Sequence, residues 1–183
     1  MALTTRTTLP LILLAGAALI AFVIFVPSCD NAGGGAPEGL VRVDISDKEG
    51  NQHTFFLEPA INNESRFKGL SGRTSIDDDG GMIFVFPNAA VRKFVMRDCP
   101  IPIDIVYIDT GGRVIAAHAM LPEDPQGEDE SDSAYEERLK RYSSRFATPL
   151  VIELQGGMIE KLGIDESVVL KVYGLDDLEK RVK

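Results

Sequence analysis

The stretch "VMRDCPIPIDIVYID", residues 95–109, decides the fold. Its second half is a run of isoleucine, valine and tyrosine that a single acid, Asp104, interrupts. Alternate residues of a β-strand face opposite sides of the sheet, and here both sets are apolar. We therefore expect residues 103–109 to form a central strand that is buried on both faces.

Asp104 is the exception that this strand has to accommodate. An ionised carboxylate buried without partners costs several kcal/mol, on the order of a protein's whole net stability. The side chain must therefore pair with a cation or accept hydrogen bonds from backbone N–H groups.

Outward from this strand, short apolar runs alternate with turn residues. Strands are predicted at residues 40–46, 52–59, 82–86, 91–96, 113–121, 148–154 and 167–174, and short helices at 62–70, 133–144 and 156–163. Strands joined by short turns favour an antiparallel sheet. We expect a mainly β (α+β) domain over residues 40–175, a small, mostly antiparallel closed barrel or sandwich with two or three short helices. A charged tail, residues 176–183, follows it.

The N-terminus carries an export signal. Residues 9–26 are uncharged, and the only basic side chain before them is Arg6. The following "VPSC", residues 26–29, resembles the lipobox of bacterial lipoproteins, which makes Cys29 the candidate lipidation site. The alternative is an uncleaved membrane anchor. Residues 1–28 are thus a signal peptide or anchor and residues 29–39 a flexible linker, and we expect the domain outside the cytoplasm, on the periplasmic side of the membrane.

Composition limits the partners. Nineteen basic residues against 28 acidic ones give a net charge of -9, which disfavours binding to nucleic acid. Two cysteines and two histidines are too few for a disulfide framework or a recognisable zinc site. We expect no metal and no cofactor.

Five motifs in order carry a resemblance to a known family. They are "RFKGLSGR" (66–73), "GGMIFVFP" (80–87), "KFVMRDCPIPIDIVYID" (93–109), "GGRVI" (111–115) and "VIELQGGMIEKLGI" (151–164). Together they resemble the domain of unknown function 192 family, also called uncharacterised protein family 0127. The resemblance implies a compact, mainly β domain, commonly exported, and it implies no activity.

The resemblance also supplies partners for Asp104. Arg66 and Arg73 of the first motif are the cations expected to brace it, or to hold a ligand together with it. Where many family members read Phe-Trp-Met-Lys-Asn-Thr, this chain has Phe, Val, Met96, Arg97, Asp98 and Cys99, so the tryptophan and the amide are absent.

Two catalytic hypotheses are alternatives to a ligand-binding function. Cys99 is a candidate reactive thiol if His118 acts as its base. Asp98 and Asp104 are the candidate acidic pair of a hydrolase or transferase acting on an envelope polymer. Neither set forms a complete catalytic constellation.

The function predicted from the sequence is a membrane-tethered, extracytoplasmic binding or accessory module, and catalysis is not expected. Its candidate ligand-binding or structural residues are Arg66, Arg73, Met96, Arg97, Asp98 and Asp104. The expected partners are the membrane and an envelope protein or small-molecule ligand, with the chain as a monomer.

Overall fold

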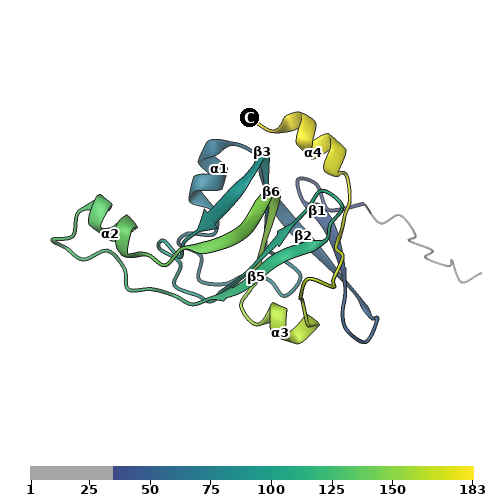
Figure 1. Ribbon diagram of the computed structural model, residues 1–183, viewed down its shortest axis with the longest axis horizontal. Coiled ribbons are helices and arrows are strands. Elements are labelled where there is room, and N and C mark those ends of the chain that lie inside the picture. Colours follow the sequence, from purple (N-terminus) through teal and green to yellow (C-terminus); the bar gives the residue numbers. More distant parts are fainter. Residues whose placement is uncertain (1–34) are drawn as a thin grey trace, which may run out of the picture. The chain divides into compact units, whose positions relative to one another are not determined.

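The computed structural model describes residues 35–183, and these fold around one seven-stranded sheet (Figure 1). Its elements are β1 (Val41–Ser46), β2 (Gln52–Ala60), α1 (Asn63–Lys68), β3 (Met82–Phe94), β4 (Ile103–Ile108), β5 (Val114–Met120), α2 (Asp132–Arg138), β6 (Tyr142–Gln155), α3 (Met158–Leu162), β7 (Lys171–Val172) and α4 (Leu175–Arg181). The predicted signal or anchor, Cys29 and most of the predicted linker lie outside the described residues. Within residues 35–183 no helix is long and apolar enough to cross a membrane.

The sheet is mixed and mostly antiparallel, in the order β5-β4-β6-β3-β2-β1-β7. The pairing of β2 with β3 is parallel because α1 lies on the connection between them, and parallel neighbours need such a crossover. The predominance of antiparallel pairing confirms the sequence prediction.

The prediction of a closed barrel or sandwich is wrong, because the sheet curls but stays open. Its edge strands β5 and β7 approach each other through a single bridge between Arg113 and Val169. The carbonyl of Gly112 accepts a 2.8 Å bond from the N–H of Leu170, and the ladder goes no further because β7 is only two residues long.

β3 and β6 are longer than predicted and form the backbone of the sheet. The two strands expected at 82–86 and 91–96 are one strand, β3, whose pairing with β6 is shifted between Val85 and Ala90. A bulge there tolerates Pro87, which has no N–H to give to the ladder. The helix expected to reach residue 144 ends at Arg138, and β6 begins at Tyr142.

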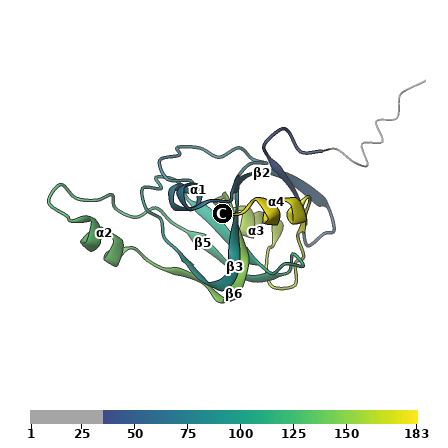
Figure 2. The same ribbon diagram turned by 90° about the horizontal axis from the view of Figure 1, so that it is seen from above.

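The sheet has an apolar core on each face. In β4, Val106 and Ile108 belong to one cluster, and Ile103, Ile105 and Tyr107 belong to the other. This confirms the central, doubly buried strand. Figure 2 shows α1 on one side of β3 and β6, with α3 and α4 on the other.

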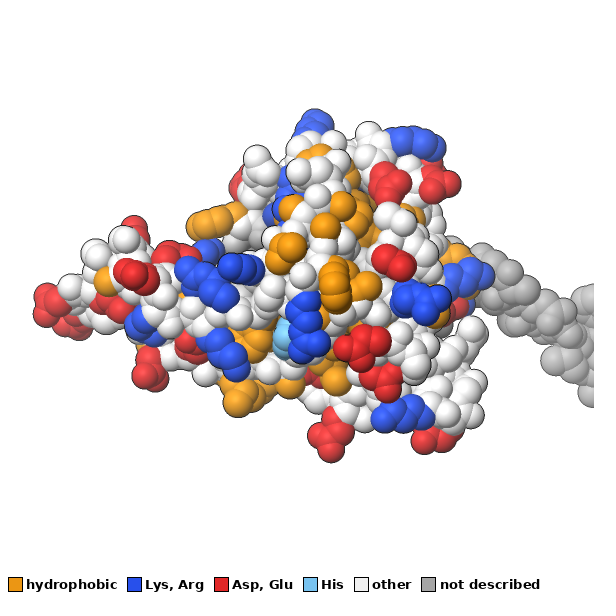
Figure 3. Space-filling view, in the orientation of Figure 1, with side chains coloured by type: hydrophobic (Ala, Val, Ile, Leu, Met, Phe, Trp, Pro, Cys, Tyr) orange, Lys and Arg blue, Asp and Glu red, His pale blue; other side chains and the backbone are white. Residues whose placement is uncertain are grey.

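Residues 35–183 contain four short helices where two or three were expected. The additional one is α4, in the segment predicted to be a charged tail, and its Leu178 is buried in the same cluster as Val106. The acidic segment 123–137 extends from the sheet as an arm that carries α2 (Figure 1), and Figure 3 shows acidic side chains gathered toward the end of that arm.

Candidate functional site

Asp104 is buried as predicted, but its partner is a helix start and not an arginine. Its carboxylate accepts a 2.6 Å hydrogen bond from the N–H of Ile159, and the N–H groups of Gly157 and Met158 also bond to it. Burial raises the pKa of Asp104, and these backbone bonds oppose the rise. The sequence allowed either a cation or backbone N–H groups as the partner of Asp104, and the structure contains the backbone N–H groups.

The predicted Arg–Asp104 brace does not form. Arg66 donates to the carbonyl of Val85 and to an oxygen of Lys183, at 2.8 and 2.6 Å. Arg73 pairs with Glu58 at 2.7 Å, and this contact raises the pKa of Arg73. The reason is topological: α1 covers the opposite face of the sheet from α3, and Asp104 faces α3.

The buried Arg–carboxylate joint of this protein is instead at Asp44 in β1. Asp44 accepts two 2.9 Å bonds from Arg42 and further bonds from Thr54 and Tyr173. The Arg42 contact is the main reason that the pKa of Asp44 is lowered. The network ties β1 to β2 and to the residue after β7.

The candidate acidic pair of a hydrolase is not assembled. Asp98 lies in the loop after β3 with a φ of 53°, and its side chain accepts a 3.2 Å bond from the hydroxyl of Tyr135 in α2. Its neighbours Met96 and Cys99 belong to the cluster on the face that Asp104 does not share. The two carboxyl groups therefore have no common cleft.

Cys99 is a buried thiol with no histidine base. Its Sγ donates to the carbonyl of Arg97 at 3.3 Å, and burial raises the pKa of the thiol to about 11. His118 bonds to the carbonyl oxygen of Ser143 and packs against the ring of Tyr142. This geometry makes Cys99 a small core residue of the hydrophobic cluster on that face of the sheet.

The face covered by α1 contains a pocket of about 660 Å³, within the usual range for small-molecule sites. It lies between α1, β3 and the loop after β3, with β6 beneath. Its lining combines aromatic rings with basic side chains: Phe67, Phe84, Phe86 and Phe94, and Arg66, Lys68, Arg92, Lys93, Arg97 and Lys183. Six cations around one cavity stand out in a chain whose net charge is -9.

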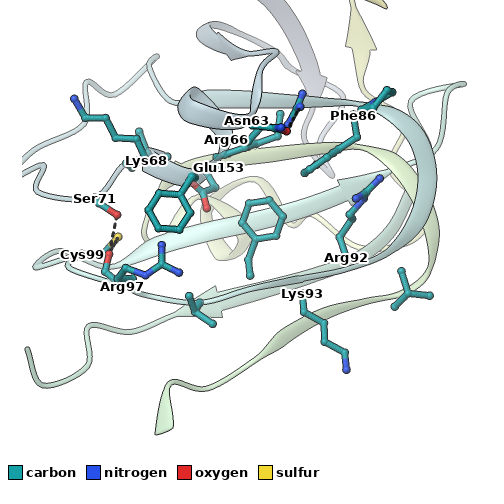
Figure 4. A pocket seen from close by; sticks show the side chains of 18 of the residues that line it. Asn63, Arg66, Lys68, Ser71, Phe86, Arg92, Lys93, Arg97, Cys99 and Glu153 are labelled. Atoms are coloured by element: carbon teal, nitrogen blue, oxygen red, sulfur yellow. Dashed lines mark hydrogen bonds between the residues drawn. The ribbon is translucent and has the colours of Figure 1, made fainter. Parts of the chain in front are cut away.

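Glu153 of β6 is the acid of this pocket. The side chain is 5% exposed, and no group among residues 35–183 donates a hydrogen bond to its carboxyl. Burial alone raises the pKa of Glu153 to about 8, so the carboxyl is mainly protonated at neutral pH. Figure 4 shows it between the two ends of the pocket.

One end of the pocket holds two guanidinium groups around a single ring. The Cζ atoms of Arg66 and Arg92 lie 5.2 and 3.8 Å from the centre of the Phe86 ring. Arg92 donates to the side chain and carbonyl of Asn88 and to the carbonyl of Thr148, all uncharged. Desolvation lowers the pKa of both arginines, and the charge of Arg66 lowers that of Arg92 further.

The other end holds Ser71, Arg97 and Cys99 (Figure 4). The Ser71 hydroxyl donates to the carbonyl of Arg97 at 2.8 Å, and the Arg97 guanidinium lies 4.4 Å from the centre of the Phe67 ring. Arg97 also pairs with Glu136 of α2, so the arm contacts the rim of the pocket. Of the residues predicted for a site, Arg66, Arg97 and Cys99 line this pocket; Arg73, Met96, Asp98 and Asp104 do not.

Comparison with known proteins identifies the family. The profile of DUF192, described as "Uncharacterized ACR", matches residues 45–172. The chain belongs to the DUF192 family.

Two solved structures share this DUF192 fold. One is a Sinorhizobium meliloti protein described as a candidate transcription regulator, with a TM-score of 0.61 and 24% identity over 74% of this chain and 95% of that one. The other is a Novosphingobium aromaticivorans protein of unknown function, with a TM-score of 0.60 and 27% identity over 72% of this chain and 84% of that one. No functionally curated protein matches the chain.

Sequence reasoning missed Glu153, Phe86 and Arg92 in this DUF192 protein. A signal for Glu153 was present, since "LVIEL", residues 150–154, places one acid inside an apolar strand as "IDIVYID" does for Asp104. Phe86 and Arg92 gave no signal, because they meet only after β3 bends at its bulge. The described residues contain no group of three metal-ligating side chains.

Proposed function

We propose that this DUF192 protein is a non-catalytic binding module that holds a small organic molecule in the pocket under α1. The observation that carries the proposal is Glu153, a residue only 5% exposed whose carboxyl lines a cavity of about 660 Å³ and accepts no hydrogen bond from residues 35–183. Among residues 35–183 no fully buried side-chain oxygen or nitrogen lacks a partner, so the unbonded oxygens of Glu153 are open to the cavity. A ligand in the cavity can bond to them.

Binding fits the lining better than catalysis does. The pocket contains one thiol, Cys99, whose raised pKa keeps it protonated, and one carboxyl, Glu153, with no second acid or histidine among the lining residues. Acid–base or nucleophilic chemistry needs two matched groups within hydrogen-bond reach. A few polar groups in an aromatic cavity are the usual composition of a binding site.

We also propose that the module works outside the cytoplasm, attached to the membrane. The support is the sequence of residues 9–29, with its uncharged run and the cysteine of a lipobox-like motif. Labelling of cells with radioactive palmitate tests this directly. Incorporation that Cys29→Ala abolishes supports the lipid anchor, and a membrane-bound but unlabelled chain supports the uncleaved one.

A role in transcription has less support. The likeness to the S. meliloti protein is at 24% identity and concerns the fold. The net charge of -9 repels a phosphate backbone, and six of the basic side chains line a concave pocket.

The binding proposal is tested on protein purified from its own membranes. Native mass spectrometry should detect a bound small molecule, and a ligand present at about 100 times its Kd should stabilise the fold by about 2.7 kcal/mol. Val95 is half-buried and lines the pocket, so Val95→Trp should fill it and abolish both effects. Val169→Trp, at an exposed site outside the pocket, should preserve them.

A second experiment gives the result that would contradict the binding proposal. The binding function would be contradicted if folded wild-type protein carries no molecule and no compound changes its melting temperature. The compounds are a mixed library of neutral, cationic and anionic molecules.

A further inference from the structure

We propose that the ligand is an amphipathic organic anion, whose negatively charged group lies by Arg66 and Arg92 and whose apolar body extends along the phenylalanine rings toward Glu153. This inference rests on the proposed function and adds the chemical class of the ligand. It predicts which end of the molecule lies at which end of the pocket.

The first step of the argument is the charge at the Phe86 end. The Cζ atoms of two guanidinium groups lie 5.2 and 3.8 Å from the centre of the same ring, and the charge of Arg66 lowers the pKa of Arg92, as like charges that repel one another do. Among residues 35–183 neither Arg66 nor Arg92 pairs with an Asp or Glu side chain, and Arg66 donates to an oxygen of Lys183 at 2.6 Å. By contrast Arg42, Arg73, Arg97 and Arg138 each pair with an acid. An anion placed between Arg66 and Arg92 would relieve their repulsion.

The second step is the geometry of the donors. A guanidinium presents several N–H groups in a planar fork that matches the oxygens of a carboxylate, sulfonate or phosphate. Arg92 has uncharged oxygens as its partners, Asn88 and Thr148; these bonds use Nε and Nη2, fix the guanidinium at the edge of the cavity and leave the two N–H groups of Nη1 for a ligand. The arginine is therefore positioned before a ligand arrives, which reduces the entropy cost of binding.

The third step is the apolar part of the pocket. The ring of Phe94 lies edge-on to Phe84 and Phe86, with centroid distances of 4.9 and 6.4 Å, and all three line the cavity. Rings set at such angles offer both faces and edges to another aromatic or aliphatic group. A purely ionic ligand, such as inorganic phosphate, would leave this surface in contact with water.

The fourth step is Glu153, whose carboxyl offers the body of the ligand a polar contact inside the cavity. A neutral carboxyl offers one O–H donor and can also accept, so it suits an oxygen or nitrogen on the body of the ligand. Its neighbours Cys99 and Tyr107 also carry protons, since burial raises the pKa of both. A cationic ligand would have to pass the six basic side chains that line the pocket.

The test uses two fluorescent probes that differ only in charge. 8-Anilinonaphthalene-1-sulfonate is an aromatic anion, and N-phenyl-1-naphthylamine has the same body without the sulfonate. Wild-type protein should bind the anionic probe at least about tenfold more tightly, a difference typical of one charge-assisted contact. Added salt should weaken the binding of the anion and leave that of the neutral probe unchanged.

Arg92→Met is the diagnostic variant. It should weaken binding of the anionic probe about tenfold and change binding of the neutral probe less than about twofold. Unchanged binding of the neutral probe also shows that the variant is folded. Arg113→Met is the matched control, because it removes the same charge at an exposed position that does not line the pocket, and it should affect neither probe.

The outcomes separate this inference from the proposed function. If both probes bind equally well and Arg92→Met changes them equally, the anion inference is wrong and the pocket still binds ligands. If neither probe binds at about 1 mM, the inference fails, and the library experiment decides the proposed function on its own. Displacement of the bound anion by 1-naphthoate or by short-chain phosphatidylglycerol supports the inference and distinguishes a free organic anion from a lipid.

Discussion

The carboxylate of Asp104 accepts a 2.6 Å hydrogen bond from the backbone N–H of Ile159, and this contact joins β4 to the start of α3. The N–H groups of Gly157 and Met158 bond to the same carboxylate. The first N–H groups of a helix have no partner inside the helix, so an acid from a neighbouring strand can satisfy them. Asp104 is thus a structural joint, and it lies outside the pocket.

Asp104→Ala should therefore lower the free energy of unfolding by about 1–3 kcal/mol, because it leaves buried N–H donors without an acceptor. Asp104→Asn keeps one acceptor oxygen and should cost less. Urea unfolding measures both. Asp109→Ala is the control, since Asp109 caps an exposed turn at Gly111 and should cost less than about 1 kcal/mol.

A double-mutant cycle extends this prediction. Asp104 and Arg66 share no contact, so the stability losses of Asp104→Ala and Arg66→Ala should add within about 0.5 kcal/mol. A coupling energy above about 1 kcal/mol would instead support the direct interaction between Arg66 and Asp104 that the sequence suggested.

Features that depend on local periodicity could be predicted from the sequence, and features that depend on distant contacts could not. The doubly buried strand β4 is visible in the alternation of its own residues. Closure of the barrel depends on β7, whose two-residue length follows from packing against β1 and not from any local pattern. The partner of Asp104 is 55 residues away, and only the crossing of α3 over β4 brings it near.

The candidate site shows the same division. Arg66 and Arg97 were predicted, since both lie in motifs of the family. Glu153 was overlooked although it interrupts an apolar strand, because Asp104 had already been taken as the buried acid of the sheet. Phe86 and Arg92 meet Arg66 only through the bend of β3, which sequence periodicity does not record.

Glu153 should make the protein less stable as the pH rises. Its pKa is raised from 4.5 to about 8, so the folded state holds a proton that the unfolded state releases above about pH 4.5. The stabilisation is complete below that pH and is lost as the pH rises through 8. The expected slope is about 1.4 kcal/mol per pH unit, or about 4 kcal/mol between pH 5 and pH 8.

Glu153→Gln should remove this slope, because the amide keeps the shape and does not ionise. The measurement is urea unfolding of both proteins at pH 5 and pH 8. Glu160→Gln removes an exposed carboxyl and should leave the slope as in the wild type. An equal slope in wild type and Glu153→Gln would show that water reaches the carboxyl and solvates it.

Cys99 should be unreactive in the folded protein. Its pKa is raised from 9.0 to about 11, which lowers the thiolate fraction at neutral pH about 100-fold, and burial hinders access as well. In a Cys29→Ala chain, reaction with 5,5′-dithiobis(2-nitrobenzoic acid) should be at least about 100-fold slower than in denaturant. Rapid stoichiometric labelling of the folded chain would instead support the reactive thiol.

Glu136→Gln should increase the affinity of the pocket for anions. Glu136 of α2 pairs with Arg97, a lining residue, and so neutralises one of the cations at the rim. The pair is partly exposed, with side chains 21% and 38% accessible, so its loss should change stability by less than about 1 kcal/mol. Without this partner, Arg97 should strengthen binding of the anionic probe about two- to fivefold, since surface charges contribute modestly in water.

Glu137→Gln makes the same change of charge at an adjacent exposed residue and should have no such effect. Equal gains from both variants would show that only the net charge matters, and that the arm does not act on the pocket through Arg97.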